Sequence, residues 1–393
     1  MKPHTLHQRL SALILCSCLC SCLLLGLLTG CGPAENSGQP PDGEAPAFTG
    51  LTYESMLPLE YAQCFQVYRY AEGHSLIRVD DGRDYLVVPE GGIIPPEAED
   101  CFVLQQPLDT IYLAATSAMA LFCAMDGLDA VRLSGSQQKS WYIEDAVWAM
   151  EEGNLVYAGK YSEPDFELLL DQGCDLAIES TMILHSPQVQ EKLEELGIPV
   201  LIDRSSYENH PLARTEWIKL YAVLLDKEEE AASFFHEQAA ILDELDNFPN
   251  TEKTVAFFYV TARGAVSVRK SDDYLATMIE LAGGRYIFPD LGDSESKTST
   301  MSMTMEDFYA GARDADILIY NASIDNPMNT LDELLLKSEL FADFKAVREG
   351  NVWCTGKSLY QATDSLGGII RDIHQILTDD GSLTEVTYMY KLH

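Results

Sequence analysis

The stretch that decides the fold is residues 109–135, "DTIYLAATSAMALFCAMDGLDAVRLSG". It opens with a short apolar run, continues as a helix that carries Phe122 and Leu128, and closes with a second apolar run. A short apolar strand, a helix and another apolar strand in succession predict two parallel strands with a crossover helix between them.

The same succession recurs along the chain. It is found again within residues 155–203, resumes at residue 254 and continues to a closing helix at residues 365–380. Strands that alternate with short helices indicate parallel sheets covered by helices on both faces. Because the chain is longer than one ordinary domain, we expect two such lobes, residues 106–212 and residues 248–393.

Two further segments complete the predicted fold. Residues 213–247 hold helical periodicity without Gly or Pro, which predicts one long linking helix. Residues 51–105 alternate apolar and polar side chains around "AEGH" and "DDGR", which predicts strands joined by hairpins. The predicted class is therefore α/β: two lobes, each a mainly parallel sheet flanked by helices, joined by one long α-helix, with a small N-terminal β-hairpin extension.

The N-terminus has the pattern of an export signal. Residues 1–30 combine a basic start with a long apolar run that ends at Leu28-Thr29-Gly30-Cys31. This ending resembles the bacterial lipoprotein box, whose cysteine is lipidated, so we expect Cys31 to anchor the chain in the membrane. Residues 31–50 are rich in Pro, Gly and small polar residues and predict a flexible tether. The expected location is the extracytoplasmic face of the cell membrane, in a bacterium without an outer membrane.

Charge and cysteine usage exclude several classes of protein. A formal net charge of −36 argues against binding to nucleic acid. Beyond Cys31, the chain keeps an odd number of scattered cysteines with no CxxC pair, so we expect neither a disulfide framework nor a metal site. No cofactor is expected. These remaining cysteines are Cys64, Cys101, Cys123, Cys174 and Cys354.

Several segments, taken in order, resemble a known family. Residues 109–135, "AGKYSEPDFELLLDQGCDLAI" and "KLEELGIPVLI" in the first lobe are similar to the substrate-binding proteins for iron-siderophore, haem and cobalamin import. In the second lobe "MIELAGGRYIF", "MSMTMEDFYAGARDADILIYN" and "VREGNVWC" follow the family order. The resemblance spans about residues 65–380. It implies a monomer with limited lobe closure around a metal chelate, which it hands to an ABC permease and its ATPase.

The ligand is expected where strands end. In open α/β sheets ligands bind beyond the carboxyl ends of the strands, and arginines and aromatic rings at those ends suit an anionic chelate. Ferric siderophore is the first expectation, followed by cobalamin or another corrinoid and then haem. The ligand-binding candidates are Thr116, Ser117, Gln137, Lys139, Trp141, Tyr142, Lys160, Tyr161 and Thr181 in the first lobe, and Tyr259, Arg263, Arg269, Lys297, Asn321 and Tyr360 in the second.

Other polar and sulfur-bearing residues have more than one interpretation. Met301, Met303 and Met305 share one face of an extended segment, which fits a soft-metal site or, more simply, strand packing. His185 and Tyr161 have the chemistry of haem-iron ligands. The family docks on its permease through acidic residues, for which the candidates are Glu191, Glu194 and Glu306; Arg285 stands where some relatives carry an acid.

An enzyme is the main alternative class. A surface-anchored hydrolase needs a nucleophile with a base in reach, yet the chain has no GxSxG, HExxH, P-loop or dinucleotide-type GxGxxG pattern. A binding protein that is not an enzyme is therefore favoured. A second alternative keeps the binding fold but passes the ligand to a sensor or another surface protein, and a neighbouring permease gene would distinguish the two.

Overall fold

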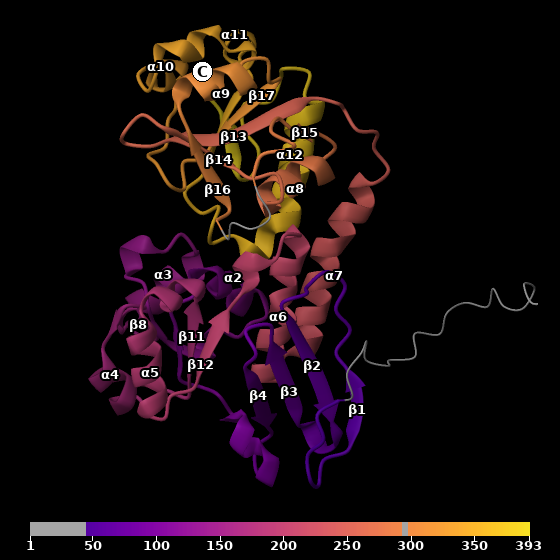
Figure 1. Ribbon diagram of the computed structural model, residues 1–393, viewed down its shortest axis with the longest axis vertical. Coiled ribbons are helices and arrows are strands. Elements are labelled where there is room, and N and C mark those ends of the chain that lie inside the picture. Colours follow the sequence, from indigo (N-terminus) through magenta and orange to yellow (C-terminus); the bar gives the residue numbers. More distant parts are fainter. Residues whose placement is uncertain (1–44, 293–297) are drawn as a thin grey trace, which may run out of the picture. The chain divides into compact units, whose positions relative to one another are not determined.

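The computed structural model describes residues 45–292 and 298–393 (Figure 1). The predicted signal peptide, the Cys31 anchor, most of the tether and Lys297 lie outside the described residues. Within those ranges, no helix has both the length and the apolar character needed to span a bilayer.

The N-terminal extension is a sheet of five strands rather than the small hairpin we expected. β1 to β4 pair antiparallel in chain order, and β5 adds parallel to β4 (indigo in Figure 1). One face is buried around Tyr68, Tyr70 and Leu86. The strands are β1 (Tyr53–Met56), β2 (Phe65–Tyr70), β3 (Ser75–Val79), β4 (Asp84–Val88) and β5 (Phe102–Gln105).

Lobe one contains the predicted parallel sheet. Its order is β12-β11-β6-β7-β8, and every pair is parallel. The strands are β6 (Ile111–Leu113), β7 (Val131–Ser134), β8 (Val156–Tyr157), β11 (Leu176–Ser180) and β12 (Val200–Asp203); the helices are α2 (Thr116–Ala124), α3 (Glu144–Glu151), α4 (Phe166–Asp171) and α5 (Pro187–Glu195).

Both faces of this sheet are covered, as the sequence predicts. Ile111 and Leu113 belong to the core cluster that contains Leu121 of α2, whereas Tyr112 belongs to the cluster that contains Leu193 of α5. Successive residues of a strand point to opposite faces, so a strand buried on both sides is apolar throughout.

The predicted single linking helix is wrong. The chain forms α6 (Pro211–Leu225) and α7 (Glu228–Leu245), separated by Asp226, whose φ of 57° is left-handed. The two helices pack side by side as an antiparallel pair: Lys219 Nζ of α6 lies 4.3 Å from the centre of the Phe235 ring of α7. The acidic run that begins at Glu228 suits the positive end of a new helix, and the turn lets apolar faces of both helices enter one core.

Lobe two has a mixed sheet with the order β16-β14-β13-β17-β18-β19, and β15 also pairs with β13. The β13–β17, β17–β18 and β13–β15 pairs are parallel, whereas the outer pairs are antiparallel. The strands are β13 (Thr254–Val260), β14 (Val266–Arg269), β15 (Arg285–Tyr286), β16 (Thr300–Met303), β17 (Ile317–Tyr320), β18 (Val352–Thr355) and β19 (Met389–Lys391); the helices are α8 (Tyr274–Leu281), α9 (Met305–Ala312), α10 (Leu331–Leu335), α11 (Lys345–Glu349) and α12 (Leu366–Thr378).

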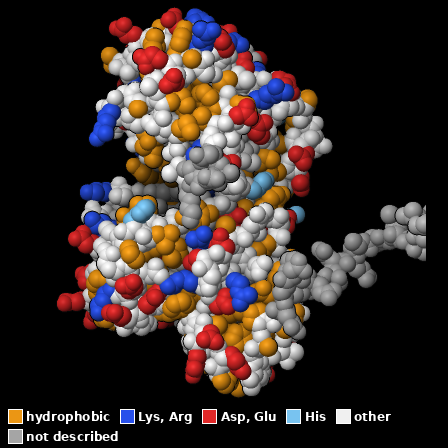
Figure 2. All heavy atoms as spheres, in the orientation of Figure 1, with side chains coloured by type: hydrophobic (Ala, Val, Ile, Leu, Met, Phe, Trp, Pro, Cys, Tyr) orange, Lys and Arg blue, Asp and Glu red, His pale blue; other side chains and the backbone are white. Residues whose placement is uncertain are grey.

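One apolar core runs through the extension, both lobes and the helices between them. It includes Phe65 of the extension, Phe122 of lobe one, Trp217 of α6, Phe235 of α7 and Trp353 of lobe two. The surface is acidic, with red carboxylate side chains spread over the visible face in Figure 2. Because packed apolar contacts join the lobes, we expect limited rather than wide movement between them.

Candidate functional site

Two adjoining hollows lie where residues of lobe one and α6 face residues of lobe two, and we call them together the cleft. The larger has a volume of about 240 Å³ and the smaller about 60 Å³, and Ser206 and Arg214 line both. The larger is lined by Arg204, Ser206, Tyr207, Asn209, Arg214, Asp272, Asp273, Thr298 and Ser299. The smaller is lined by Ser117, Ser205, Ser206, Arg214, Tyr274, Leu359, Tyr360, Thr363 and Leu366.

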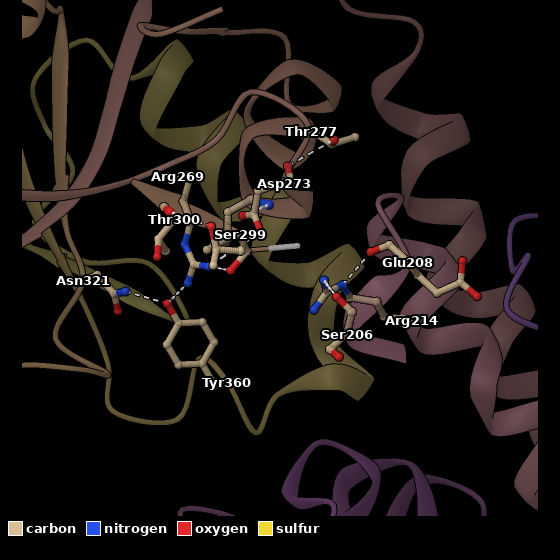
Figure 3. Close-up of polar contacts among 12 residues, drawn as sticks. Ser206, Glu208, Arg214, Arg269, Asp273, Thr277, Ser299, Thr300, Asn321 and Tyr360 are labelled. Atoms are coloured by element: carbon tan, nitrogen blue, oxygen red, sulfur yellow. Dashed lines mark hydrogen bonds and ion pairs between the residues drawn. The ribbon is translucent and has the colours of Figure 1, made fainter. Parts of the chain in front are cut away.

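Arg214, in the first turn of α6, is held firmly in this cleft. Its Nε donates to the Glu208 carbonyl oxygen at 3.0 Å and its Nη2 to the Ser206 carbonyl oxygen at 2.8 Å (Figure 3). Its guanidinium carbon lies 3.7 Å from the centre of the Tyr274 ring. Burial lowers the pKa of Arg214, but an arginine stays protonated at any physiological pH. Within the described chain, Nη1 is left for a ligand.

Arg269, at the end of β14, lines neither hollow, but it bonds two residues that do, Tyr360 and Ser299. It is buried and donates to the Tyr360 hydroxyl and, from Nη1, to the Ser299 hydroxyl at 3.2 Å. Asn321 Nδ2 donates to the same Tyr360 oxygen at 2.6 Å, and Figure 3 shows this hydroxyl between Asn321 and Arg269. Burial raises the pKa of Tyr360, so the phenol is neutral. The hydrogen bonds from Arg269 and Asn321 fix the hydroxyl end of the Tyr360 ring at the cleft.

Asp273 balances part of this positive charge. Its Oδ2 lies 3.6 Å from Nη1 of Arg269, and its Oδ1 accepts from the Leu275 amide as the N-cap of α8. Burial raises the pKa of Asp273, although Arg269 and the capping amide oppose the shift. Asp273 is not the only carboxylate near the cleft, because Asp272 lines the larger hollow and buried Asp203 lies close enough to act on Arg214. The cleft therefore suits an anionic group through the donors that the arginines present and not through a surplus of positive charge.

The cleft is not the largest hollow in the described chain. A hollow of about 780 Å³ lies at the other end of the lobe-one strands, beside Thr110 and Ala130, which directly precede β6 and β7. Ligands of open α/β sheets bind beyond the carboxyl ends of strands, and none of our sequence candidates lines this hollow. We therefore take the cleft, and not this larger hollow, as the candidate ligand site.

The structure brings four sequence candidates to this site. Arg269, Asn321 and Tyr360 form the hydrogen-bonded group described above, although they come from the ends of three separate strands. Ser117 lines the smaller hollow and donates to Asp203 at 3.0 Å. Thr116 is its neighbour at the start of α2.

The other candidates lie elsewhere. Trp141, predicted as a cleft wall, is buried in the lobe-one core, where its Nε1 donates to the Ser134 hydroxyl at 3.3 Å. Tyr161 packs partly buried against the other lobe-one cluster. None of the remaining candidates lines either cleft hollow within the described chain: Gln137, Lys139, Tyr142, Lys160, Thr181, Tyr259 and Arg263.

The docking and metal candidates are placed as follows. Glu191 and Glu306 are exposed, whereas Glu194 accepts from Arg83 at 2.7 Å; Arg285 pairs with Glu252. Met301 and Met303 lie on β16 opposite Val268 and Val266, whereas Met305 begins α9, so the expected single extended segment is wrong. Met303 and Met305 pack on the lobe-two core and Met301 is exposed, so strand packing holds only in part. His185 is exposed, the five cysteines from Cys64 onward are free, and the described residues hold no His/Cys/Asp/Glu cluster fit for a metal.

The sequence reasoning missed two arginines, Arg204 and Arg214. Arg204 directly follows β12, a parallel strand, so the strand-end rule applied to it as well as to Asn321 after β17. Arg214 had no such signal, because it lies inside a helix and reaches the cleft only through the packing of α6.

The fold and the cleft define a two-lobed binding protein. The sequence profile of the family described as periplasmic binding protein matches residues 126–359, and the chain belongs to this family.

Two curated relatives come from Methanocaldococcus jannaschii, and both are named uncharacterized lipoproteins. One is 27% identical over 307 residues, covering 73% of this chain and 69% of the relative. The other is 24% identical over 349 residues, covering 85% of this chain and 86% of the relative.

Solved structures share the fold at low sequence identity. A petrobactin-binding protein from Bacillus subtilis has a TM-score of 0.58 and 12% identity, covering 78% of this chain and 99% of its own. A periplasmic heme-binding protein of Vibrio cholerae has a TM-score of 0.54 and 18% identity, covering 68% and 98%. An Fe3+-hydroxamate transport protein from Saccharomonospora viridis has a TM-score of 0.51 and 18% identity, covering 70% and 94%.

Proposed function

We propose that this protein is the substrate-binding component of an ABC importer and that it captures an anionic metal chelate, in the first place a ferric siderophore. The observation that carries the proposal is the pair Arg214 and Arg269, both fixed by hydrogen bonds. Arg214 of α6 lines both hollows, and Arg269 of lobe two stands directly behind Tyr360 and Ser299 in their walls. Arginines with their geometry fixed in advance bind carboxylate or catecholate oxygens with little loss of side-chain entropy.

The size of the cleft indicates how such a ligand binds. Hollows of about 240 and 60 Å³ are each below the usual range for a whole drug-sized ligand. They suit one acidic group of a chelate, while the remainder lies between the lobes. Tyr360 and Tyr274 provide aromatic surface beside that group.

The same chemistry ranks the alternative ligands. Cobalamin offers no comparable cluster of acidic groups for two arginines. Haem offers two propionates, but no histidine lines either hollow in the described part of the chain, so its iron would depend on a tyrosine, and the hydroxyl of Tyr360 already accepts from Arg269 and Asn321. Ferric siderophore therefore stays first, with haem and corrinoid as outcomes of the binding experiment.

A lipid anchor at Cys31 and an extracytoplasmic location belong to this proposal. Its support is the Leu-x-Gly-Cys ending of the apolar run and the lipoprotein names of the two archaeal relatives. An anchored receptor stays at high effective concentration beside its permease.

Replacing Arg269 with methionine is expected to weaken chelate binding roughly 10- to 100-fold, because a charge-assisted hydrogen bond is lost. The measurement is quenching of tryptophan fluorescence of the purified full-length chain by ferric tricatecholate, ferric trihydroxamate, haem and cobalamin. Arg263→Met is the matched control, since Arg263 is exposed and, unlike Arg269, has no hydrogen bond to a residue of either hollow in the described chain. Equal loss in both variants would remove the assignment of the cleft, and no saturable binding of any ligand would sink the chelate proposal.

A further inference from the structure

Arg204 is a third arginine at the cleft, and it is the only one of the three whose partner comes from the N-terminal extension. It directly follows β12 and lines the larger hollow together with Arg214. Its Nε donates to Oδ1 of Asp80, and its Nη2 lies 3.3 Å from Oδ2 of the same carboxylate. The guanidinium carbon also lies 4.6 Å from the centre of the Tyr207 ring.

Asp80 is held in place by the way the extension covers lobe one. It lies in the turn between β3 and β4, and its amide donates to the Cys64 carbonyl oxygen at 2.9 Å. Along the same turn, Arg83 Nη1 and the Tyr85 hydroxyl both donate to the Val200 carbonyl oxygen, at 3.0 and 2.7 Å. Val200 begins β12, the edge strand of the lobe-one sheet, and Arg204 follows its end. The extension therefore covers this edge and places Asp80 against Arg204, which lines the larger hollow.

The pair is exposed unequally. The side chain of Arg204 is 16% exposed, whereas that of Asp80 is 37% exposed. An arginine stacked on a ring keeps its position when its carboxylate partner moves away, and an exposed carboxylate is readily rehydrated. Arg204 can therefore exchange Asp80 for an anionic group of a ligand without leaving the cleft wall.

We infer that Asp80 is a specificity-determining residue of the cleft: it competes with the ligand for Arg204 and so limits how strongly the cleft attracts highly charged chelates. The inference rests on the proposed function of the cleft and adds the extension to the ligand site. Asp80 lies outside residues 126–359, the segment that matches the family profile. A ligand of low charge binds against Arg214 and Arg269 alone, whereas a more anionic ligand must displace Asp80 to gain the third arginine.

The test compares ligands of different charge. Asp80→Asn is expected to raise the affinity for a trianionic ferric tricatecholate on the order of tenfold, the effect of freeing one charge near a protein surface, and to leave a neutral ferric trihydroxamate unchanged. In an Arg204→Gln background the gain should vanish. Calorimetric titration of the full-length chain with each ligand compares four proteins: the wild type, Asp80→Asn, Arg204→Gln and the double variant. Asp84→Asn is the matched control, because it breaks another arginine pair of the extension, Arg78–Asp84, that lines neither hollow.

A ligand-free measurement separates this inference from the proposed function. Phenylglyoxal modification of Arg204, followed by peptide mass spectrometry, should be several-fold faster in Asp80→Asn than in the wild-type chain or Asp84→Asn. An unchanged rate overturns the inference whatever the ligand is. A gain in affinity that also appears in Asp84→Asn, or that persists without Arg204, overturns it too. If the rate rises but the wild-type chain binds neither chelate, the proposed ligand class fails while the control of Arg204 by Asp80 stands.

Discussion

Replacing Glu179 with glutamine is expected to stabilise the protein by about 4 kcal/mol at pH 8 and by less than about 1 kcal/mol at pH 5. Glu179 lies on β11 beside Ile202 of β12 and is fully buried. Neither of its carboxylate oxygens has a hydrogen-bond partner in the described structure. Burial without a partner raises the pKa of Glu179 to about 8.

The direction of the pH dependence follows from where the proton is held. Between its unfolded pKa of 4.5 and its folded pKa of about 8, Glu179 is protonated in the folded protein and ionised in the unfolded chain. The folded state binds more protons in this window, so the free energy of unfolding falls as the pH rises through it. Glutamine has a similar shape and no charge, so the free energy of unfolding of the variant should not fall with pH in this window.

Chemical denaturation of the wild-type protein and Glu179→Gln at pH 5 and pH 8 measures the effect. Glu191→Gln is the control, because Glu191 is exposed on the neighbouring helix α5 and should change stability little at either pH. A difference between wild type and Glu179→Gln that is the same at both pH values would mean that the carboxyl group does not titrate in this window.

The strand-end rule accounts for only part of the lobe-two half of the cleft. Asn321 and Tyr360 follow the carboxyl ends of β17 and β18, which are parallel and end at one edge of the sheet. Arg269 ends β14, which runs antiparallel to β13, so the rule does not place it at this edge, and its hydrogen bond to Tyr360 is what joins it to the other two. The rule located Asn321 and Tyr360 without showing that they hydrogen-bond one another. That contact depends on the path of the residues between the end of β18 and Tyr360, which brings the Tyr360 hydroxyl to Arg269 and Asn321.

The lobe-one half could not be predicted in the same way. Trp141 is the kind of aromatic residue that often lines a ligand site. Inside the core, however, the Ser134 hydroxyl accepts its ring N–H, so burial there stabilises the side chain more than exposure in the cleft would. Arg214 reaches the cleft because α6 packs against lobe two, through contacts far apart in sequence. Helical periodicity alone could not show the turn at Asp226 either, since the residues on both sides are good helix formers.

Glu216 is the residue through which the extension is fixed to α6, and replacing it with alanine is expected to destabilise the protein by about 3–5 kcal/mol. It is fully buried. Oε1 accepts from the Glu60 amide at 2.8 Å and from Lys219 Nζ at 2.7 Å. Oε2 accepts from the Tyr61 amide at 2.8 Å and the Ala62 amide at 2.7 Å. Removing the carboxylate leaves three amides without their acceptor and takes from Lys219 Nζ its shortest one, since its other partners, the Pro58 carbonyl oxygen and the Glu60 carboxylate, lie at 3.4 and 3.5 Å.

The loss of stability should exceed the contribution of these hydrogen bonds alone, because the extension shares the apolar core of the lobes. Phe65, which follows the residues that Glu216 holds, packs 5.1 Å from Trp217 between ring centres. Denaturant unfolding gives the magnitude, and hydrogen exchange at residues 60–62 shows whether the segment is released. Glu229→Ala, an exposed change at the start of α7, is the control. A loss below about 1 kcal/mol with unchanged exchange would mean that water replaces the carboxylate and that apolar packing alone holds the extension.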